Sequence, residues 1–204
     1  MKNILCFGDS NTWGCVPGVL SRFPSDKRWT GLLARALGED YTVIEDGIKG
    51  RTAAVDDPHC SFRNGLSSLG YSLHRASPID LMIVMLGTND IEYVGSRGYY
   101  HGIKTLGQQI LLANPLFAGT SPIFTETRLL LVSPIEETPN MPHYEESKKL
   151  AYYTEKAAKE LGVPWLDAAR FAKPSPLDGC HMDEEGHAAL AKAIYDAVKE
   201  VLGY

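Results

Sequence analysis

Five short apolar segments, none of which alternates polar with apolar residues, constrain the fold of this 204-residue chain most strongly. They cover residues 4–7, 41–44, 81–86, 129–132 and, more weakly, 163–166. Strands without alternation are buried on both faces, as in a parallel sheet. The sequence therefore predicts about five parallel strands.

Segments with helical periodicity lie between these apolar segments. They predict helices over residues 29–36, 103–112 and 144–161, and a last helix that Asp183 caps. Residues 51–76 contain turn residues and only short periodic pieces, so their structure is the least clear. Strands that alternate with helices form right-handed crossovers, which give a parallel sheet sandwiched between helices. We expect one domain over residues 1–204, because most chains of this length form one.

Composition excludes several classes of protein. The net charge of −5 argues against nucleic-acid binding and, more weakly, against an anionic membrane surface. No apolar run approaches the roughly 20 residues that span a bilayer, and the N-terminal run is too short for a signal peptide. The four cysteines form no C-x-x-C pair, and the spacing of Cys180, His181, Asp183 and His187 fits no common metal motif. We expect a cytoplasmic protein with reduced thiols and no metal.

Polar motifs follow the predicted strands at four places. They are GDSN at residues 8–11, the glycines Gly47 and Gly50, GTND at 87–90 and DGCH at 178–181. The carboxyl ends of parallel strands meet at one edge of the sheet, where ligands bind. This edge would collect a hydroxyl, glycine N–H groups, a carboxamide and an Asp/His pair, the set that a serine esterase needs. Taken alone, GDSN is more typical of a strand-to-helix turn in which Asp9 or Ser10 caps the helix than of a nucleophile.

With these four blocks in this order, the chain resembles the SGNH hydrolases, also called GDSL-type esterases and lipases. CFGDSNTWG and MLGTND are most similar to the bacterial arylesterase and acyltransferase branch. The resemblance implies a flavodoxin-like three-layer α/β/α sandwich and a serine carboxylic-ester hydrolase that acts on small acyl esters. It also implies no cofactor, an acyl-serine intermediate that allows acyl transfer or perhydrolysis, and a tendency to form homo-oligomers.

The resemblance assigns roles residue by residue. Ser10 is expected to be the nucleophile, His181 its base and Asp178 the carboxylate partner of the histidine. The oxyanion donors are expected to be the N–H groups of Ser10 and Gly50 and the carboxamide of Asn89. Gly47 competes with Gly50 for this role, and the GRT context favours Gly50.

Two features near these blocks lead to further expectations. Asn11 stands where the family name has leucine, and we expect this difference to leave the chemistry unchanged. Lys49 and Arg51 flank Gly50 and put positive charge near the site, with no specified consequence. Asp9 is expected only to brace its turn, and His187 to be structural.

Three aromatic residues are candidates for substrate binding. Trp13, three residues after Ser10, is expected to form a wall of the acyl pocket. The alternative interpretation is that Trp13 is part of the hydrophobic core. Tyr93 and Phe124 belong to the least regular part of the chain, which would line the acyl pocket or contact another subunit. An ordinary capping loop is the alternative for this region.

Two other functions stay open. The same site would serve a carbohydrate O-deacetylase or a thioesterase. A flavodoxin-like binding module without activity is the alternative from a different class, and it is disfavoured because no catalytic position is missing.

Overall fold

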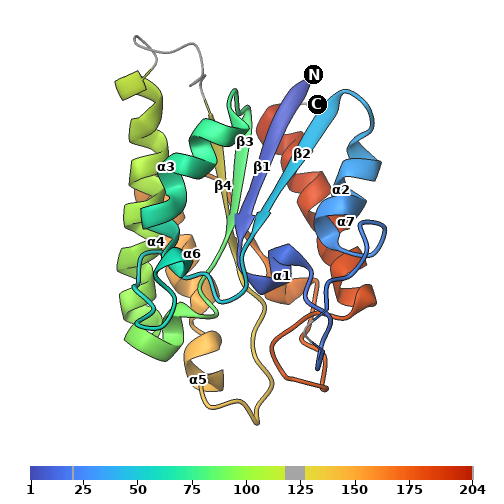
Figure 1. Cartoon of the computed structure of the whole chain (residues 1–204), viewed down its shortest axis with the longest axis vertical. Helices are drawn as coiled ribbons and strands as arrows, with labels where there is room; N and C mark the ends of the chain where they lie inside the picture. The colour runs from blue at the N-terminus through green and yellow to red at the C-terminus, as the bar shows by residue number, and fades with distance from the viewer. Residues whose placement is uncertain (20, 118–126, 204) are drawn as a thin grey trace.

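The computed structural model describes residues 1–19, 21–117 and 127–203, and its centre is a five-stranded parallel sheet. The strand order is β2-β1-β3-β4-β5, with every pair parallel (Figure 1). The strands are β1 Lys2–Gly8, β2 Tyr41–Gly47, β3 Leu81–Met85, β4 Arg128–Ser133 and β5 Trp165–Asp167. The predicted flavodoxin-like sheet is therefore confirmed, since 2-1-3-4-5 is the flavodoxin order.

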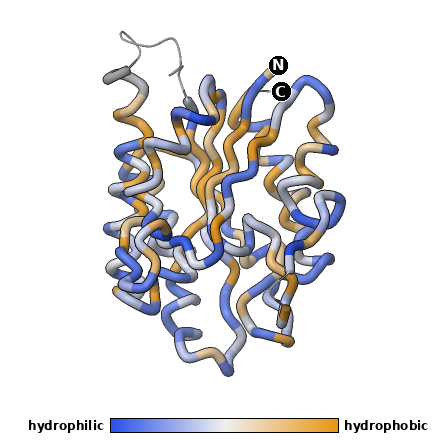
Figure 2. The backbone as a smooth tube through the Cα atoms, in the orientation of Figure 1, coloured by the Kyte–Doolittle hydropathy of each residue, from blue (hydrophilic) through white to orange (hydrophobic). Residues whose placement is uncertain are grey.

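Helices cover both faces of the sheet and form the three layers. Helices α3 (Gly65–Ala76), α4 (Asp90–Phe117) and α6 (Leu150–Leu161) bury apolar side chains against one face. Helices α2 (Trp29–Leu37) and α7 (Glu184–Leu202) pack against the other face. The apolar strands form the hydrophobic centre between these layers (Figure 2). Among the described residues, no helix has the length and apolar character to cross a membrane.

The region from residue 51 to 76, unclear from the sequence, contains the 3₁₀ turn Ser61–Arg63 and α3. The Asn64 side chain caps α3 by accepting hydrogen bonds from the N–H groups of Leu66 and Ser67. Two glycines and three serines give this helix a low intrinsic propensity, so its formation depends on tertiary packing.

Two other helices differ from expectation. The predicted helix over 144–161 is divided into α5 (Tyr144–Ser147) and α6, because residues 148 and 149 interrupt it. The helix expected near 103–112 is longer, and α4 bends at Gly95, where φ is 62°. The Glu146 carboxylate accepts hydrogen bonds from the N–H and hydroxyl of Ser96, so it caps the second part of α4.

Three strands end level with one another at the edge that carries the motifs. Gly8 at the end of β1 pairs with Gly47 of β2 and with Met85 of β3. Helix α1 (Ser10–Trp13) lies directly across this edge, away from the N-terminus and the end of α7 (Figure 1). A Cβ atom on Gly47 would overlap the backbone nitrogen of Trp13. Gly47 therefore lets α1 pack closely against the end of β2.

Replacing Gly47 by alanine should destabilise the fold by about 1–3 kcal/mol, because the new methyl group meets backbone atoms that cannot move aside. The matched control is Gly70→Ala in α3, where an added Cβ meets nothing within 4 Å. This control should stabilise the protein by about 0.5–1 kcal/mol. Denaturant unfolding measures both changes, and equal stability of Gly47→Ala and the wild type would contradict the packing described for α1.

Candidate active site

Ser10 begins helix α1 immediately after the end of β1. Asp9 is the N-cap residue, and its Oδ1 accepts a hydrogen bond of 2.9 Å from the N–H of Asn11. Gly14 ends the helix with φ of 88°, a left-handed conformation that favours glycine. This short helix presents Ser10, which is half-buried, at the carboxyl edge of the sheet.

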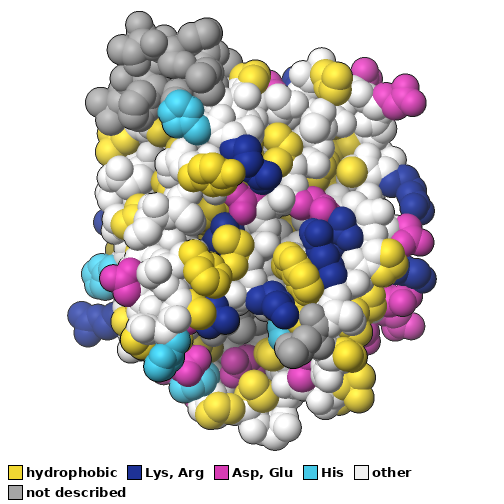
Figure 3. Space-filling model, viewed as in Figure 1, with side chains coloured by type: hydrophobic (Ala, Val, Ile, Leu, Met, Phe, Trp, Pro, Cys, Tyr) yellow, Lys and Arg dark blue, Asp and Glu magenta, His cyan; other side chains and the backbone are white. Residues whose placement is uncertain are grey.

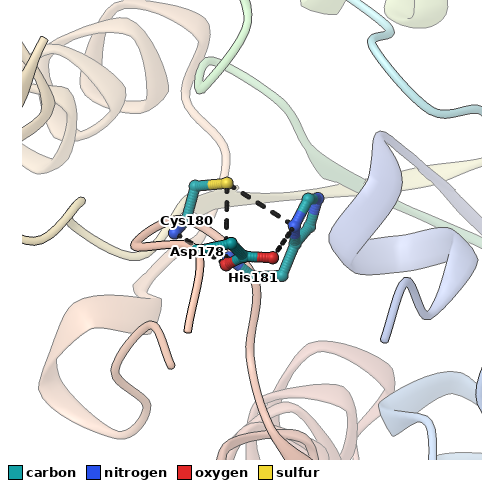
Figure 4. Close-up of side chains that lie close together, drawn as sticks. All are labelled: Asp178, Cys180 and His181. Atoms are coloured by element: carbon teal, nitrogen blue, oxygen red, sulfur yellow. Dashed lines mark hydrogen bonds and ion pairs between the residues drawn. The ribbon is translucent and has the colours of Figure 1, made fainter. Parts of the chain in front are cut away.

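Asp178 and His181 reach the same edge from the loop that precedes α7. His181 Nδ1 lies 2.8 Å from Asp178 Oδ2, and His181 Nε2 lies 2.9 Å from Ser10 Oγ. In Figure 4 the imidazole stands between the Asp178 carboxylate and helix α1. A carboxylate only accepts, so the hydrogen belongs to Nδ1 and the neutral ring accepts the Ser10 proton at Nε2. Three residues expected from the sequence thus form one hydrogen-bonded row.

Backbone hydrogen bonds hold the Asp178 carboxylate in place. Oδ1 accepts from the N–H groups of His181 at 3.0 Å and Cys180 at 3.2 Å, and Oδ2 accepts from the N–H of Gly18 at 2.8 Å. Burial alone raises the pKa of Asp178, but hydrogen bonds from His181, Gly18 and Cys180 lower it further than burial raises it. The net pKa is below that of an ordinary aspartate, so Asp178 is ionised at neutral pH.

The Cys180 thiol lies beside this pair and does not share its role. Asp178, Cys180 and His181 offer donor atoms within 4.8 Å of one another, a grouping able in principle to hold a metal ion. The nitrogen of His181 that faces this group is already bonded to Asp178. Burial, followed by the charge of Asp178, raises the pKa of Cys180 to about 12, so its sulfur stays protonated. The donor set therefore fits a hydrogen-bonded Asp–His pair better than a metal site.

Asn11 holds the backbone on both sides of His181, a structural role that we did not predict from the sequence when we expected the difference from leucine to leave the chemistry unchanged. Its Nδ2 donates to the carbonyl of Cys180 at 3.0 Å, and its Oδ1 accepts from the N–H of Met182 at 3.0 Å. Asn11 is buried, so a leucine here would leave both backbone groups without these partners. The sequence shows the polar residue but gives no sign of its partners.

The expected oxyanion donors lie around a tight turn after β2. The N–H of Arg51 donates to the carbonyl of Ile48 at 3.1 Å, and Gly50, at the third position of this turn, has φ of 77°. Such a φ favours glycine. The Asn89 Nδ2 donates one hydrogen bond of 2.9 Å to the carbonyl of Arg51 and carries a second N–H. Gly47 contacts α1 as described above, and the choice of Gly50 over Gly47 as the donor stays a prediction.

Two buried carboxyl groups lie beneath the site. Burial raises the pKa of Asp9 to about 6, against the opposing effects of the Asn11 N–H, His181 and Arg51. Burial also raises the pKa of Asp90 to about 7. The hydrogen bond of 2.9 Å that Asp90 accepts from the N–H of Ala53 lowers this pKa by less than burial raises it. The folded state therefore binds these protons more tightly than the unfolded chain. Their contribution to stability is complete below a pH of about 4 and is lost progressively as the pH rises to about 6 for Asp9 and about 7 for Asp90.

The aromatic residues that the sequence predicts to bind substrate have different surroundings in the structure. Trp13 is partly exposed at the end of α1, with Lys49 Nζ 5.0 Å and Arg22 Cζ 5.4 Å from its ring centroid. Figure 3 shows basic and hydrophobic side chains together over this part of the surface. Trp13 is therefore neither fully buried nor surrounded only by apolar groups. Phe124 lies outside the described residues.

Tyr93 is exposed on α4, near the ion pair between Asp57 and Arg63. Burial and the charge of Asp57 raise the pKa of Tyr93. The Arg63 side chain packs over Gly50, since a Cβ added to Gly50 would lie 2.7 Å from Arg63 Nε. Tyr93 thus belongs to the group of side chains on the Gly50 side of the site.

His187 is buried in α7 and does not join the hydrogen-bonded row. Its Nδ1 accepts from the N–H of Trp29 at 3.3 Å, and its ring contacts Phe23 edge to face. Burial lowers the pKa of His187 to about 4, so the ring is neutral at physiological pH. These contacts agree with the structural role expected for this histidine.

A model of the GDSL-like lipase/acylhydrolase family matches residues 6–189, which include all four motif blocks. The chain belongs to this family. A search of curated protein sequences gives no significant match.

Solved structures of esterases closely match nearly the whole chain. The aryl esterase of M. smegmatis is 34% identical, with a TM-score of 0.91, and the match covers 98% of this chain and 100% of that one. A carbohydrate acetylesterase from Sinorhizobium meliloti is 32% identical, with a TM-score of 0.91 and coverage of 98% and 99%. A putative arylesterase from Agrobacterium tumefaciens str. C58 is 33% identical, with a TM-score of 0.89 and coverage of 98% and 100%.

In this GDSL-like protein, Asn11→Leu should lower the free energy of unfolding by about 1–3 kcal/mol, because two backbone groups lose their partners. It should also slow the reaction of Ser10 with a fluorophosphonate, since His181 is held less firmly. The control is Thr127→Val, which removes another buried hydrogen bond, to the carbonyl of Ile79, at the opposite edge of the sheet. The control should lose stability but react at the wild-type rate. An Asn11→Leu variant that reacts as fast as the control would contradict the role given to Asn11.

Proposed function

We propose that this chain is a serine carboxylic-ester hydrolase that cleaves small acyl esters through an acyl-serine intermediate. The observation that carries the proposal is the row of hydrogen bonds from Ser10 Oγ through His181 to Asp178. A serine hydroxyl is a weak nucleophile unless a neighbouring base accepts its proton. The 2.9 Å contact provides that base, and membership of the GDSL-like family supports ester cleavage as the reaction.

Acylation begins when Ser10 Oγ forms a bond to the ester carbonyl carbon and its proton passes to His181 Nε2. Asp178 accepts a hydrogen bond from the N–H at Nδ1 throughout, so it fixes the tautomer of His181 and stabilises the imidazolium. The tetrahedral intermediate then loses the alcohol, and His181 donates its proton to the departing oxygen. Ser10 is left as an acyl ester.

The oxyanion of this intermediate is proposed to accept hydrogen bonds from the N–H groups of Ser10 and Gly50 and from the Asn89 carboxamide. The bond from Asn89 to the Arg51 carbonyl fixes the orientation of the amide before substrate binds. Donors held in advance stabilise developing charge without reorganisation, and each contributes about 10²–10³ in kcat.

Deacylation repeats the sequence with water. His181 takes a proton from water as it attacks the acyl carbon, and then returns a proton to Ser10 Oγ. An alcohol or hydrogen peroxide in place of water gives acyl transfer or perhydrolysis. Every step uses groups of this chain, so the mechanism requires no cofactor.

Several finer points stay predictions. They are the acyl pocket formed by Trp13, Tyr93 and Phe124, the single domain, the homo-oligomer and the cytoplasmic location. Trp13 has the strongest support, since it ends the helix that Ser10 begins.

The nucleophile is tested by labelling with a fluorophosphonate, followed by intact-mass analysis and peptide mapping. The wild type should gain one adduct on Ser10, and Ser10→Ala should gain none and lose ester turnover. Ser68→Ala in α3 is the control, because it removes a partly buried serine hydroxyl that donates to the carbonyl of Gly65. An adduct on another residue, or turnover retained by Ser10→Ala, would refute the proposal.

Acetylated sugars form a second candidate class of substrate, which the match to the Sinorhizobium meliloti enzyme favours. We expect kcat/KM for an aryl acetate to exceed those for an acetylated sugar and an acyl-CoA. A kcat/KM highest for the acetylated sugar would identify a carbohydrate deacetylase, and one highest for acyl-CoA a thioesterase. No turnover of any of the three by folded protein would favour a binding module.

A further inference from the structure

Arg51 is a buried cation that lies directly behind the proposed oxyanion donors. Its side chain is 1% exposed, although the sequence suggested only a positive charge near the site. Its Nη1 donates to the carbonyls of Gly8 and Asp46, and its Nη2 lies 2.9 Å from Asp46 Oδ1. The guanidinium also stacks over the ring of Phe7, with Cζ 4.0 Å from the ring centroid.

Burying a charge is costly unless partners compensate it. The Asp46 carboxylate, 11% exposed, supplies the opposite charge, and two strand-end carbonyls accept further hydrogen bonds. These partners come from β1 and β2, so the guanidinium ties together the ends of two neighbouring strands. Apolar side chains would fill this part of the core without such partners. The segments that Arg51 contacts therefore indicate its role.

Arg51 is part of, or is hydrogen-bonded to, each of the three segments that carry the groups proposed to bind the oxyanion. Its guanidinium holds the carbonyl of Gly8, two residues before the N–H of Ser10. Its own N–H closes the turn that contains Gly50. Its carbonyl accepts from the carboxamide of Asn89 at 2.9 Å. One residue therefore connects three donors that lie on three separate strand ends.

We propose that Arg51 is a positioning residue, which sets the distances among the three oxyanion donors and acts on the reaction only through them. This inference rests on the proposed esterase function. Arg51 itself touches no substrate, because its side chain is buried behind the turn. Its influence should appear in the stabilisation of the transition state and not in the binding of the ester.

The planar fork of the guanidinium explains why arginine and not lysine stands here. Arg51 reaches two carbonyls and a carboxylate in different directions, whereas a lysine ammonium is a compact charge on a flexible stem. Arg51→Lys therefore keeps the charge but loses at least one of these contacts. It is the most informative variant, since it changes geometry more than electrostatics.

Arg28 offers a matched control. It pairs with Glu45, the residue before Asp46 on β2, and Nη1 donates to the carbonyl of Phe23 at 2.9 Å. Its side chain is 12% exposed. Arg28→Lys thus disturbs a similar ion pair on the same strand, but it leaves the turn at Gly50 and the contact with Asn89 intact.

The kinetic test compares these variants with an aryl acetate as substrate. Arg51→Lys should lower kcat by about 10–100-fold, the effect of displacing groups by about 1 Å, with KM changed less than about twofold. Arg28→Lys should keep kcat near the wild-type value. Adding Asn89→Ala should cost less in Arg51→Lys than in the wild type, because both act on the same donor. Equal losses of kcat in the two lysine variants, or additive effects with Asn89→Ala, would overturn the proposal.

A second measurement does not depend on turnover. In ¹⁵N–¹H NMR spectra, Arg51→Lys should shift the backbone amide of Gly50 and the side-chain amide of Asn89, and Arg28→Lys should leave both unchanged. Unshifted signals in Arg51→Lys would refute the positioning role. A wild type that turns over no ester would refute the proposed function instead, and the spectra would still decide whether Arg51 sets these positions.

A third variant covers the case in which Arg51→Lys does not fold. Asp46→Asn removes the charge partner and leaves the carbonyl contacts of Arg51 in place. It should shift the same two amide signals and lower kcat by a smaller factor than Arg51→Lys is expected to do. Unchanged signals and unchanged kcat in Asp46→Asn would overturn the proposal.

Discussion

The in-register parallel pairing of β1 with β2 and β3 is the constraint on which the rest of the structure depends. Gly8, Gly47 and Met85 end their strands at one level, and the chain leaves all three strands in the same direction. Ser10, Gly50 and Asn89 follow within a few residues of these ends. A one-residue shift in register would reverse the faces of a strand and separate groups that now lie together.

A polar layer supports the site between the apolar sheet and the solvent. Arg51, Asp46, Asp9 and Asp90 are buried or nearly buried there, and each has a hydrogen-bond or ion-pair partner. The hydrogen bonds of Arg51 to Gly8 and of Asp90 to Ala53 join different strand ends. Apolar side chains would fill this space at lower electrostatic cost. The partners of these groups are mostly main-chain atoms of the loops that carry Ser10, Gly50 and Asn89, so the layer fixes loop conformation where no regular structure does.

The sequence is sufficient for the sheet and for the assembly of Ser10, Asp178 and His181, because apolar strands and strand-end motifs are local patterns. It is insufficient where a residue acts through distant partners. Helix α3 contains glycines and serines of low intrinsic propensity, so local conformational preferences do not predict it. Asn11 and Arg51 are polar residues whose burial depends on segments far away in the chain, and no local pattern reveals which polar residues are buried.

The contacts between α1 and the loop at His181 join residues 171 positions apart. Closing so long a loop is entropically unfavourable until the intervening sheet has formed. At synthesis rates of about 5–20 residues per second, His181 is synthesised roughly ten to thirty seconds after Ser10. A nascent or C-terminally shortened chain therefore lacks the proposed base of Ser10, and reactivity of this proposed nucleophile should report that both ends of the sequence have joined one fold.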